Sequence, residues 1–456
     1  MLQGSGSFFA SIAMVTLEEQ GLLQLFAELV PEGQWRELVG GKKRPQIYTL
    51  PVVVGMMMLQ RLGERGTQEE AVDRLLLGQL DHLLPESKRV EGDKISPNTG
   101  AYAKACGQVS VEVVKSITDQ LLEELGKRIK PEPELKVPLL LLDGSSLQLE
   151  HVPELLEDFP AGRNQYGEGH WGIVKWVALH DVETGIPLRP AWGPMYGEKA
   201  VSEQELAREA LQRAPAGSVV LGDGNFGIFV FAYETTGQNH RVLFRLSKPR
   251  ALSLAGGKRL ARGERKVVWR PSRLEREKYP ALPPEAQIEG RLMVVNKKGF
   301  REPLYLFTTL LEPRETVMSW YPKRWNIELD LRTLKHTMRL RHLRGKSTAA
   351  VEKELLIAVV AYGLVRAFMA LAARRAGLSP RQLSFTRAYG LVNALIGRLC
   401  TADAVEQQKD YERMLDYVGK AKLPRRLKPR SYPRAVWGRG KTYPKRGSLN
   451  SDAESK

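Results

Sequence analysis

Cysteine and histidine are scarce in this sequence. Its 456 residues include two cysteines, Cys106 and Cys400, and seven histidines. It has no CxxC pair and no two histidines at the spacing of metal ligands on a helix. These absences argue against a disulfide scaffold and a structural zinc site, and they favour a reducing cytoplasm.

Long apolar runs without a charge are missing as well. The segment from Leu355 to Ala373 is nearly long enough to span a bilayer, but Arg366 lies inside it. An arginine there costs roughly 2.5–3.5 kcal/mol on insertion scales, so we interpret the segment as a buried core helix and expect no membrane partner. The apolar run from Phe8 to Val15 has no Lys or Arg before it, which argues against a secretory signal.

Acidic residues are outnumbered by basic ones. The chain has 69 Lys and Arg against 52 Asp and Glu, a net charge of +17. This balance favours a polyanionic partner, and nucleic acid is the commonest one. A ribosome-associated protein or a simply basic enzyme is the alternative. The proportions of apolar and charged residues are those of a globular protein, and the length predicts two to four structural units.

Apolar periodicity and turn signals divide the chain into five segments. Residues 1–136 predict an N-terminal helical domain, either DNA-binding or a small packing bundle. Residues 137–245 predict the first part of an α/β core, and residues 246–310 a β-rich, basic insertion. Residues 311–400 predict the second part of the core with C-terminal helices. Residues 401–456 predict a basic tail that is partly disordered.

Two aspartates follow buried strands in the predicted core. Asp143 ends the apolar run KVPLLLLD, and Asp223 ends SVVLGD. In open α/β sheets the carboxyl ends of the strands are where sites are built. Between these strands, two strand-like runs joined by a turn at 183–185 complete a predicted three-strand meander. A helix then begins at Ser202, which has the spacing of a capping box with Glu205.

One helical stretch, WYPKRWNIELDLRTLKHTMRL, combines an apolar stripe with a polar one. At 100° per residue, Tyr321, Arg324, Glu328 and Lys335 share about one-sixth of the circumference. Their ordinary interpretation is a solvated face on which Arg324 and Glu328 form an i,i+4 ion pair. The two strand-ending aspartates upstream favour a site instead.

The spacing Y-x2-R-x3-E-x6-K resembles the YREK signature of DDE transposases of bacterial insertion sequences, specifically the insertion sequence 4 family. Asp143 in LLLLDGSS resembles the first aspartate of that family. Asp223 in GDGNF resembles the second, which is often followed by D-x-x-F. The resemblance implies an α/β fold with an RNase H-like catalytic core, a mixed sheet flanked by helices. It also implies that residues 246–310 are the family's β-rich insertion.

The resemblance further implies a catalytic triad of Asp143, Asp223 and Glu328 that binds two Mg²⁺ ions, with Mn²⁺ as a substitute. Asp143 would bridge both metals, and the other two carboxylates would each bind one. Such a site cleaves a phosphodiester and joins a 3′ hydroxyl to new DNA by in-line displacement. The implied activity is cut-and-paste transposition.

Four further residues are candidate DNA ligands. In the family the residues matched by Tyr321, Arg324 and Lys335 hold the DNA end near the cut, as a hydroxyl donor, a bidentate guanidinium and a point charge. Trp269 lies in the basic β segment and would stack on an unpaired base, as an aromatic does in relatives that form hairpin ends. A packed hairpin tryptophan is the alternative for Trp269.

The expected partners are double-stranded DNA, both terminal inverted repeats and target DNA, and a second copy of the chain, because two ends must be paired. The expected location is the bacterial cytoplasm at the nucleoid. Two alternatives stay open: a domesticated DNA-binding protein that lost the chemistry, and a metal-dependent nuclease or resolvase without a joining step. The intact triad argues against the first but does not exclude the second.

Overall fold

The computed structural model describes residues 47–129, 138–296 and 302–424, apart from residues 93, 166, 402 and 403. Predictions made for residues 1–46, for 130–137 and for the end of the basic tail, 425–456, lie outside the described residues. The described elements up to Lys422 belong to one compact unit. The five segments therefore remain predictions from the sequence, and the structure does not divide at their boundaries.

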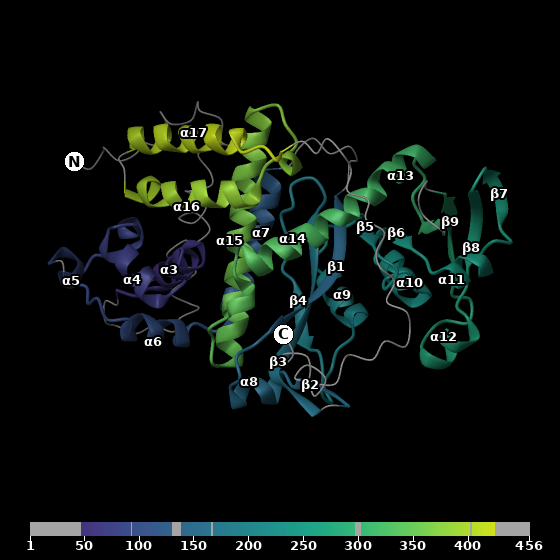
Figure 1. Ribbon diagram of the computed structural model, residues 1–456, viewed down its shortest axis with the longest axis horizontal. Helices are drawn as coiled ribbons and strands as arrows, with labels where there is room; N and C mark the ends of the chain where they lie inside the picture. The colour runs from purple at the N-terminus through teal and green to yellow at the C-terminus, as the bar shows by residue number, and fades with distance from the viewer. Residues whose placement is uncertain are drawn as a thin grey trace, which may run out of the picture. The chain divides into compact units, whose positions relative to one another are not determined.

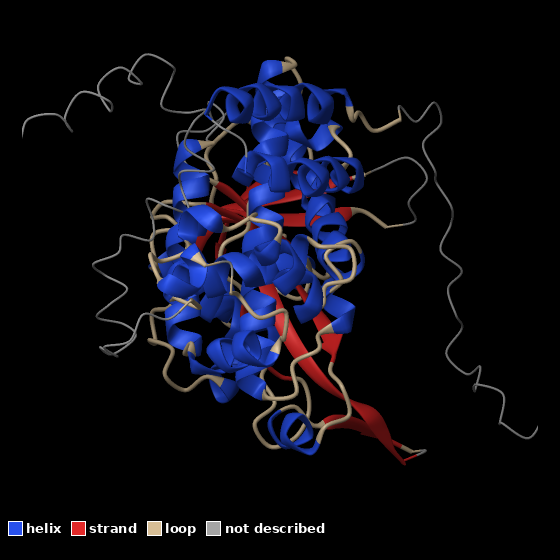
Figure 2. Cartoon of the chain, turned by 90° about the vertical axis from the view of Figure 1, so that its left-hand side faces the viewer, coloured by secondary structure: helices blue, strands red, loops and turns tan. Residues whose placement is uncertain are grey.

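The described part of the N-terminal segment, residues 47–129, is helical, as predicted. Its elements are α3 (Leu50–Leu62), α4 (Gln68–Leu76), η1 (Asp81–Leu83), α5 (Lys88–Glu91), α6 (Gly100–Gln108) and α7 (Val111–Arg128). Ser110 caps α7, and the apolar residues of α7 at helical spacing, among them Val114, Leu121 and Leu125, are buried. Figure 2 views the molecule from the side of these helices, with the strands behind them.

The core sheet has the strand order β4-β3-β1-β5-β6. Its strands are β1 (Leu139–Gln148), β3 (Gly167–Asp181), β4 (Ala191–Pro194), β5 (Val219–Gly222) and β6 (Arg241–Arg245), and the short β2 (Ala161–Asn164) pairs with β3. The β1, β3 and β4 strands form the predicted antiparallel meander, while β5 and β6 run parallel to β1. This mixed order is that of an RNase H-like core.

The two faces of the core sheet pack against different helices. On one face, Leu139 and Leu141 of β1 join a cluster with α7, α14 (Trp325–His336) and α15 (Thr348–Arg375). On the other face, Leu140 and Leu142 join a cluster with α9 and α10. The helices of the second face are α9 (Glu203–Leu211) and α10 (Phe229–Gly237), and α8 (Pro153–Asp158) lies earlier in the chain. The capping box of Ser202 and Glu205 begins α9, as predicted. Odd- and even-numbered residues of β1 therefore face opposite helices.

The β-rich insertion extends the core sheet, because its strands continue the order as β6-β10-β9-β8-β7. Its elements are α11 (Lys248–Ser253), β7 (Lys258–Ala261), β8 (Glu264–Trp269), α12 (Arg273–Lys278), β9 (Ile288–Val295) and β10 (Leu304–Thr308). Figure 1 shows these strands beyond β6, at the side of the sheet away from the N-terminal helices.

The chain after the insertion is helical. Its elements are α13 (Arg314–Trp320), η2 (Tyr321–Arg324), α14 (Trp325–His336), η3 (Leu340–His342), α15 (Thr348–Arg375), η4 (Pro380–Gln382), α16 (Phe385–Thr401) and α17 (Ala404–Lys420). The first part of the predicted basic tail is thus a helix, α17, and it packs on α15 and α16.

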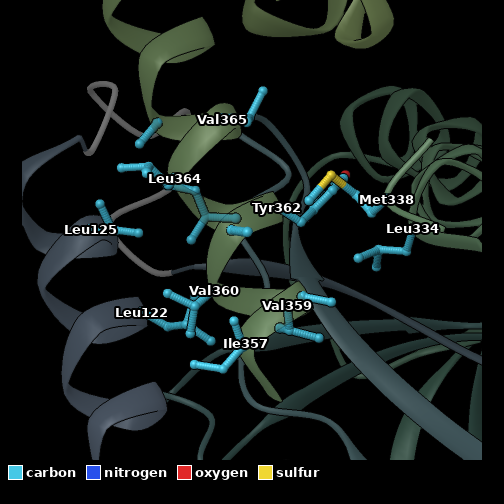
Figure 3. Packing of buried hydrophobic residues seen from close by; sticks show 14 of the residues in the cluster. Leu122, Leu125, Leu334, Met338, Ile357, Val359, Val360, Tyr362, Leu364 and Val365 are labelled. Atoms are coloured by element: carbon cyan, nitrogen blue, oxygen red, sulfur yellow. The ribbon is translucent and has the colours of Figure 1, made fainter. Parts of the chain in front are cut away.

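The apolar segment predicted to be a core helix lies in α15. This helix passes a length and composition test for a membrane span, but its most apolar stretch is wholly buried inside the protein. Figure 3 shows its side chains Ile357 and Val360 facing Leu122 of α7, while Leu334 of α14 lies on the other side. The core-helix interpretation is therefore confirmed.

Candidate active site

Asp143 lies within β1 and not at its end, which corrects the prediction from the apolar run. β1 pairs with β5 only from Leu139 to Leu141, but with β3 as far as Gln148. The apolar run stops where the second neighbour strand stops, because beyond that point β1 is no longer covered as a central strand. Asp143 therefore lies just beyond the point where β5 ends, at the same edge of the sheet as the carboxyl end of β5.

Asp223 directly follows β5, as predicted. Its carboxylate accepts a hydrogen bond from the backbone N–H of Asn225 at 2.9 Å, which forms a tight turn after the strand. Phe226 is fully buried under this turn. Residue alternation places Asp143 and Asp223 on the face of the sheet that carries Leu141 and Leu221, the face covered by α14.

Glu328 lies in the first turn of α14, but Tyr321 and Arg324 precede that helix. They belong to η2, a short 3₁₀ turn that contains Pro322 and joins α13 to α14. The single regular helix assumed from the sequence is therefore interrupted, because proline removes a backbone donor and tightens the turn. Both Tyr321 and Arg324 are buried.

Arg324 links the carboxylates of α14 and β1. Its Nη2 donates to Oε1 of Glu328 at 3.0 Å, and its Nη1 lies 3.6 Å from Oδ2 of Asp143. Among the described residues, its buried Nε–H has no hydrogen-bond partner. A buried guanidinium with one unmet donor is suited to an additional anionic acceptor.

The carboxylates of the site influence one another. Burial raises the pKa of Asp143 to about 7, opposed by the hydrogen bond from the backbone N–H of Gly144; the nearby charges of Asp223 and Glu328 raise it further, while Arg324 opposes them. Asp143 thus responds to both other members of the predicted triad. The structure brings the three acidic residues and Arg324 together, although they lie as much as 185 positions apart in the chain.

The donor set fits a divalent cation. No three carboxylate, imidazole or thiol groups within the described ranges are yet close enough to hold a metal ion as they stand. Arg324 pairs with Asp143 and Glu328. Burial is the main cause of the raised pKa of Asp143, and the negative charges of Asp223 and Glu328 add to it. Oxygen ligands of this kind suit Mg²⁺, which needs few protein carboxylates.

The remaining predicted DNA ligands lie at different distances from the triad. Burial raises the pKa of Tyr321, and the charges of Arg324, Arg245 and Asp223 also act on its hydroxyl, so Tyr321 belongs to the site. Lys335 lies seven residues after Glu328 on the same helix, about 10 Å along its axis. Burial lowers the pKa of Lys335, and the neighbouring Arg341 lowers it further.

Trp269 has the alternative environment considered for it, that of a packed tryptophan. Its side chain is 2% exposed, and its ring makes edge-to-face contacts with Phe229 and Phe307. Its neighbour Val268 points outward and is exposed. A base could not stack on Trp269 without opening this cluster, so the structure places Trp269 in the core of the insertion and not at a DNA surface.

Two further groups near the site were not predicted from the sequence. Glu203, the first residue of α9, binds Asn225 in the turn after Asp223. The capping box predicts where α9 begins. No local pattern in the sequence predicts that the side chain of Glu203 lies near the site.

The second group is a buried ion network around Asp330, two residues after Glu328. Its carboxylate accepts hydrogen bonds from Arg366 of α15, from Nη1 of Arg381 at 2.7 Å and from Nδ1 of His180 at 3.2 Å. Burial alone would raise the pKa of Asp330, but Arg366 and Arg381 outweigh it and hold the pKa far below its usual range. The network fastens α14 to β3 and α15.

An RNase H-like sheet with three carboxylates at one edge defines a class of metal-dependent enzymes that cleave and transfer nucleic acid strands. A family model described as "Transposase DDE domain" matches residues 136–364, half of the chain, with the whole triad inside the match. The chain belongs to the DDE transposases, and within them to the insertion sequence 4 family. It is a DNA-cleaving and DNA-transferring enzyme.

Two known proteins are similar to this chain. The chain is 27% identical over 382 residues to the transposase InsG for insertion sequence element IS4 of Escherichia coli strain K12, covering 81% of this chain and 82% of InsG. A cryo-EM structure of the piggyBac transposase synaptic complex with hairpin DNA covers 91% of this chain and 87% of that one, with a TM-score of 0.40 and 11% identity. The fold assignment does not rest on this likeness but on the strand order.

Proposed function

We propose that this protein is a cut-and-paste transposase that binds the ends of an insertion sequence, cuts the DNA and joins it to a target. Asp143, Asp223 and Glu328 are its catalytic residues. The observation that supports this most is the meeting of Asp143, Asp223 and Glu328 at the sheet edge, where Arg324 pairs with Asp143 and Glu328 and the charges of Asp223 and Glu328 act on Asp143. A site with surplus negative charge is completed by cations, and cations are what phosphoryl transfer between DNA strands needs.

The proposed cofactor is Mg²⁺, with Mn²⁺ as a substitute. Two such ions supply activation of the attacking oxygen and stabilisation of the leaving oxygen in an in-line displacement. Asp143 would hold both ions, and Asp223 and Glu328 would each hold one. The half-buried position of Asp143 and the hydrogen bond from the backbone N–H of Gly144 fix the direction of its carboxylate.

The cations and the phenol of the site are proposed to hold the DNA end. Arg324 is positioned between two carboxylates, and its buried Nε–H would donate to a phosphate oxygen. Tyr321 contributes a hydroxyl beside it. Lys335, further along α14, would bind the backbone at a neighbouring position as a point charge.

The proposed partners are terminal inverted repeats, target DNA and a second copy of the chain, since two ends must meet before they are joined. Within the chain, the N-terminal helical segment 1–136 and the basic insertion 246–310 are the proposed DNA-binding parts beside the core. The proposed location is the bacterial cytoplasm, at the nucleoid.

The deciding experiment uses DNA that carries the inverted repeats flanking the reading frame. Wild-type protein with Mg²⁺ should cut at the repeats and join the exposed 3′ ends to a target plasmid. Glu328→Gln should lose both products while end binding stays, because it removes a metal ligand without removing a DNA contact. Glu315→Gln, an exposed glutamate in α13, is the matched control and should act as wild type.

Each contrary result points to a different conclusion. Cleavage by Glu328→Gln would remove Glu328 from the triad. Cutting without joining by the wild type would indicate a nuclease, and binding without cutting would indicate a DNA-binding protein that has lost the chemistry.

A further inference from the structure

The first residue of α9, Glu203, faces the active site from the side of the sheet opposite to α14. Even-numbered residues of β1 face α9, and Gly144 is the one that directly follows Asp143. A Cβ added to Gly144 would lie 2.7 Å from both Cγ and Cδ of Glu203, and closer still to Oε1. The glycine after Asp143 is therefore the residue that makes room for the Glu203 side chain.

The other carboxylate oxygen of Glu203 binds the turn that carries Asp223. Nδ2 of Asn225 donates to Oε2 of Glu203 at 3.1 Å, and the backbone N–H of Asn225 donates to Asp223 at 2.9 Å. Nε2 of Gln204 donates to the backbone oxygen of Asn225 at 2.9 Å. The first turn of α9 thus holds Asn225 at two points, and Asn225 holds Asp223.

Helix capping does not account for this arrangement. Acidic residues favour the first turn of a helix because of its dipole, but exposed side chains already gain from it, so the dipole does not require a side chain that points inward. In α9 the cap is already made by Ser202 and Glu205. Glu203 is instead turned inward, where burial and the charge of Asp223 raise its pKa against the opposing hydrogen bond from Asn225. This orientation places a carboxylate beside the negative charge of Asp223, which is unfavourable, so we infer that the contacts of Glu203 contribute to the site.

We propose that Glu203 is a positioning residue of the transposase: it fixes the separation of Asp143 and Asp223 by packing against Gly144 and binding Asn225. This inference rests on the proposed function, because it assigns Glu203 to the metal-binding pair of aspartates. Glu203 acts through the two neighbours of the aspartates and binds neither metal nor DNA itself.

Metal binding measured directly, by calorimetry with Mn²⁺ on full-length protein, tests the proposal apart from activity. Glu203→Ala should raise the dissociation constant for Mn²⁺ about 10- to 100-fold, the usual effect of losing a group that orients a metal ligand. Glu205→Ala is the matched control on the same turn. It should lower the melting temperature, since it removes half of the capping box, and leave Mn²⁺ binding unchanged.

Two more variants separate positioning from ligation. Glu203→Gln keeps an oxygen that accepts from Asn225, so it should restore most of the Mn²⁺ affinity. Asn225→Ala should weaken Mn²⁺ binding, and adding Glu203→Ala to it should change little, because the two residues act in one chain of contacts.

The outcomes are distinct. If Glu203→Ala, folded by circular dichroism, binds Mn²⁺ as the wild type does, the positioning role is wrong. If Glu203→Gln is as weak as Glu203→Ala, the carboxylate charge itself is required, which overturns positioning in favour of ligation. If the wild type binds no Mn²⁺ and cuts no DNA, the proposed function fails and not this inference alone.

Discussion

The helix α14 carries two acidic residues, Glu328 and Asp330, whose surroundings have opposite charge balances. Two residues along a helix correspond to about 200°, so the two side chains point to nearly opposite sides. Glu328 shares the single Arg324 with Asp143, and Asp223 lies nearby.

Asp330 is fully buried and receives two arginines and a histidine. The pKa of Asp143 on the first side is raised to about 7, and that of Asp330 on the second is far below its usual range. The difference shows which side is complete without a ligand. Asp330 has its counter-charges within the protein and serves the fold, while the carboxylates on the Glu328 side share one arginine, which suits the proposed binding of cations there.

Removing the charge of Asp330 should have the largest effect on stability. Asp330→Asn leaves the buried Arg366 and the half-buried Arg381 without their common counter-charge, so we expect a loss of about 3–5 kcal/mol in the free energy of unfolding. Urea titration followed by circular dichroism measures it. Glu328→Gln is the control and should change stability by no more than about 0.5 kcal/mol, as a substitution outside the packed core does. Equal, small losses in both variants would end the contrast between the two sides.

The burial of Asp143 beside two other carboxylates, on the other side, should make the stability of the protein depend on pH. The pKa of Asp143 is raised in the folded protein from 3.8 to about 7, so the folded state binds more protons than the unfolded state between these values. Its contribution to stability is therefore full below about pH 4 and is lost as the pH rises through 7.

Asp143→Asn removes this loss. Without metal, the variant should be more stable than wild type at pH 8, by on the order of 1–3 kcal/mol, and the gap should close towards pH 4. Urea titrations in EDTA at several pH values measure the gap. Added Mg²⁺ should then stabilise the wild type but not the variant. A gap that is the same at pH 4 and pH 8 would mean that the pKa of Asp143 is not raised in the folded protein.

The sequence indicated three acidic residues that the structure brings to one edge of the sheet, because each of them depends on a local pattern. Asp223 ends a short apolar strand, and Glu328 lies on a polar helix stripe beside an apolar one. Asp143 was found for a partly wrong reason, since the apolar run marks where the β5 neighbour ends and not where β1 ends. An apolar run indicates where a strand is buried on both faces, but it does not indicate where the strand ends.

The residues that were missed depend on contacts between distant segments. From the sequence, Arg366 was interpreted only as a residue that disfavours membrane insertion. Its partner Asp330 could not be predicted, because it lies 36 positions away on another helix. The environment of Trp269 could have been inferred, since it alternates with the exposed Val268 and Lys266 on β8 and shares the inward side of Val267. The basic residues around Trp269 favoured a DNA-binding surface, although the alternation of buried and exposed residues along β8 indicated a core position.

The smallest expected effect concerns Lys335, which extends the ligand-binding side of α14. The neighbour that most affects its charge is another cation, Arg341, so binding a phosphate would relieve repulsion there. Lys335→Ala should weaken binding to the inverted repeats and reduce the slope of log affinity against log salt by about 0.9, the value for one phosphate contact. Fluorescence anisotropy between low and moderate salt measures this slope.

Lys127 provides the control for this slope, because it is an exposed cation on α7 that already pairs with Glu123 and Glu124. Lys127→Ala should leave the slope as it is, since its charge is neutralised before DNA arrives. If the two variants change the slope equally, Lys335 contributes only to the general positive field of the protein. If Lys335→Ala alone reduces the slope, Lys335 binds a DNA phosphate. The side of α14 that carries Glu328 would then also carry the cation that holds the substrate, as a site that binds both metal and DNA requires.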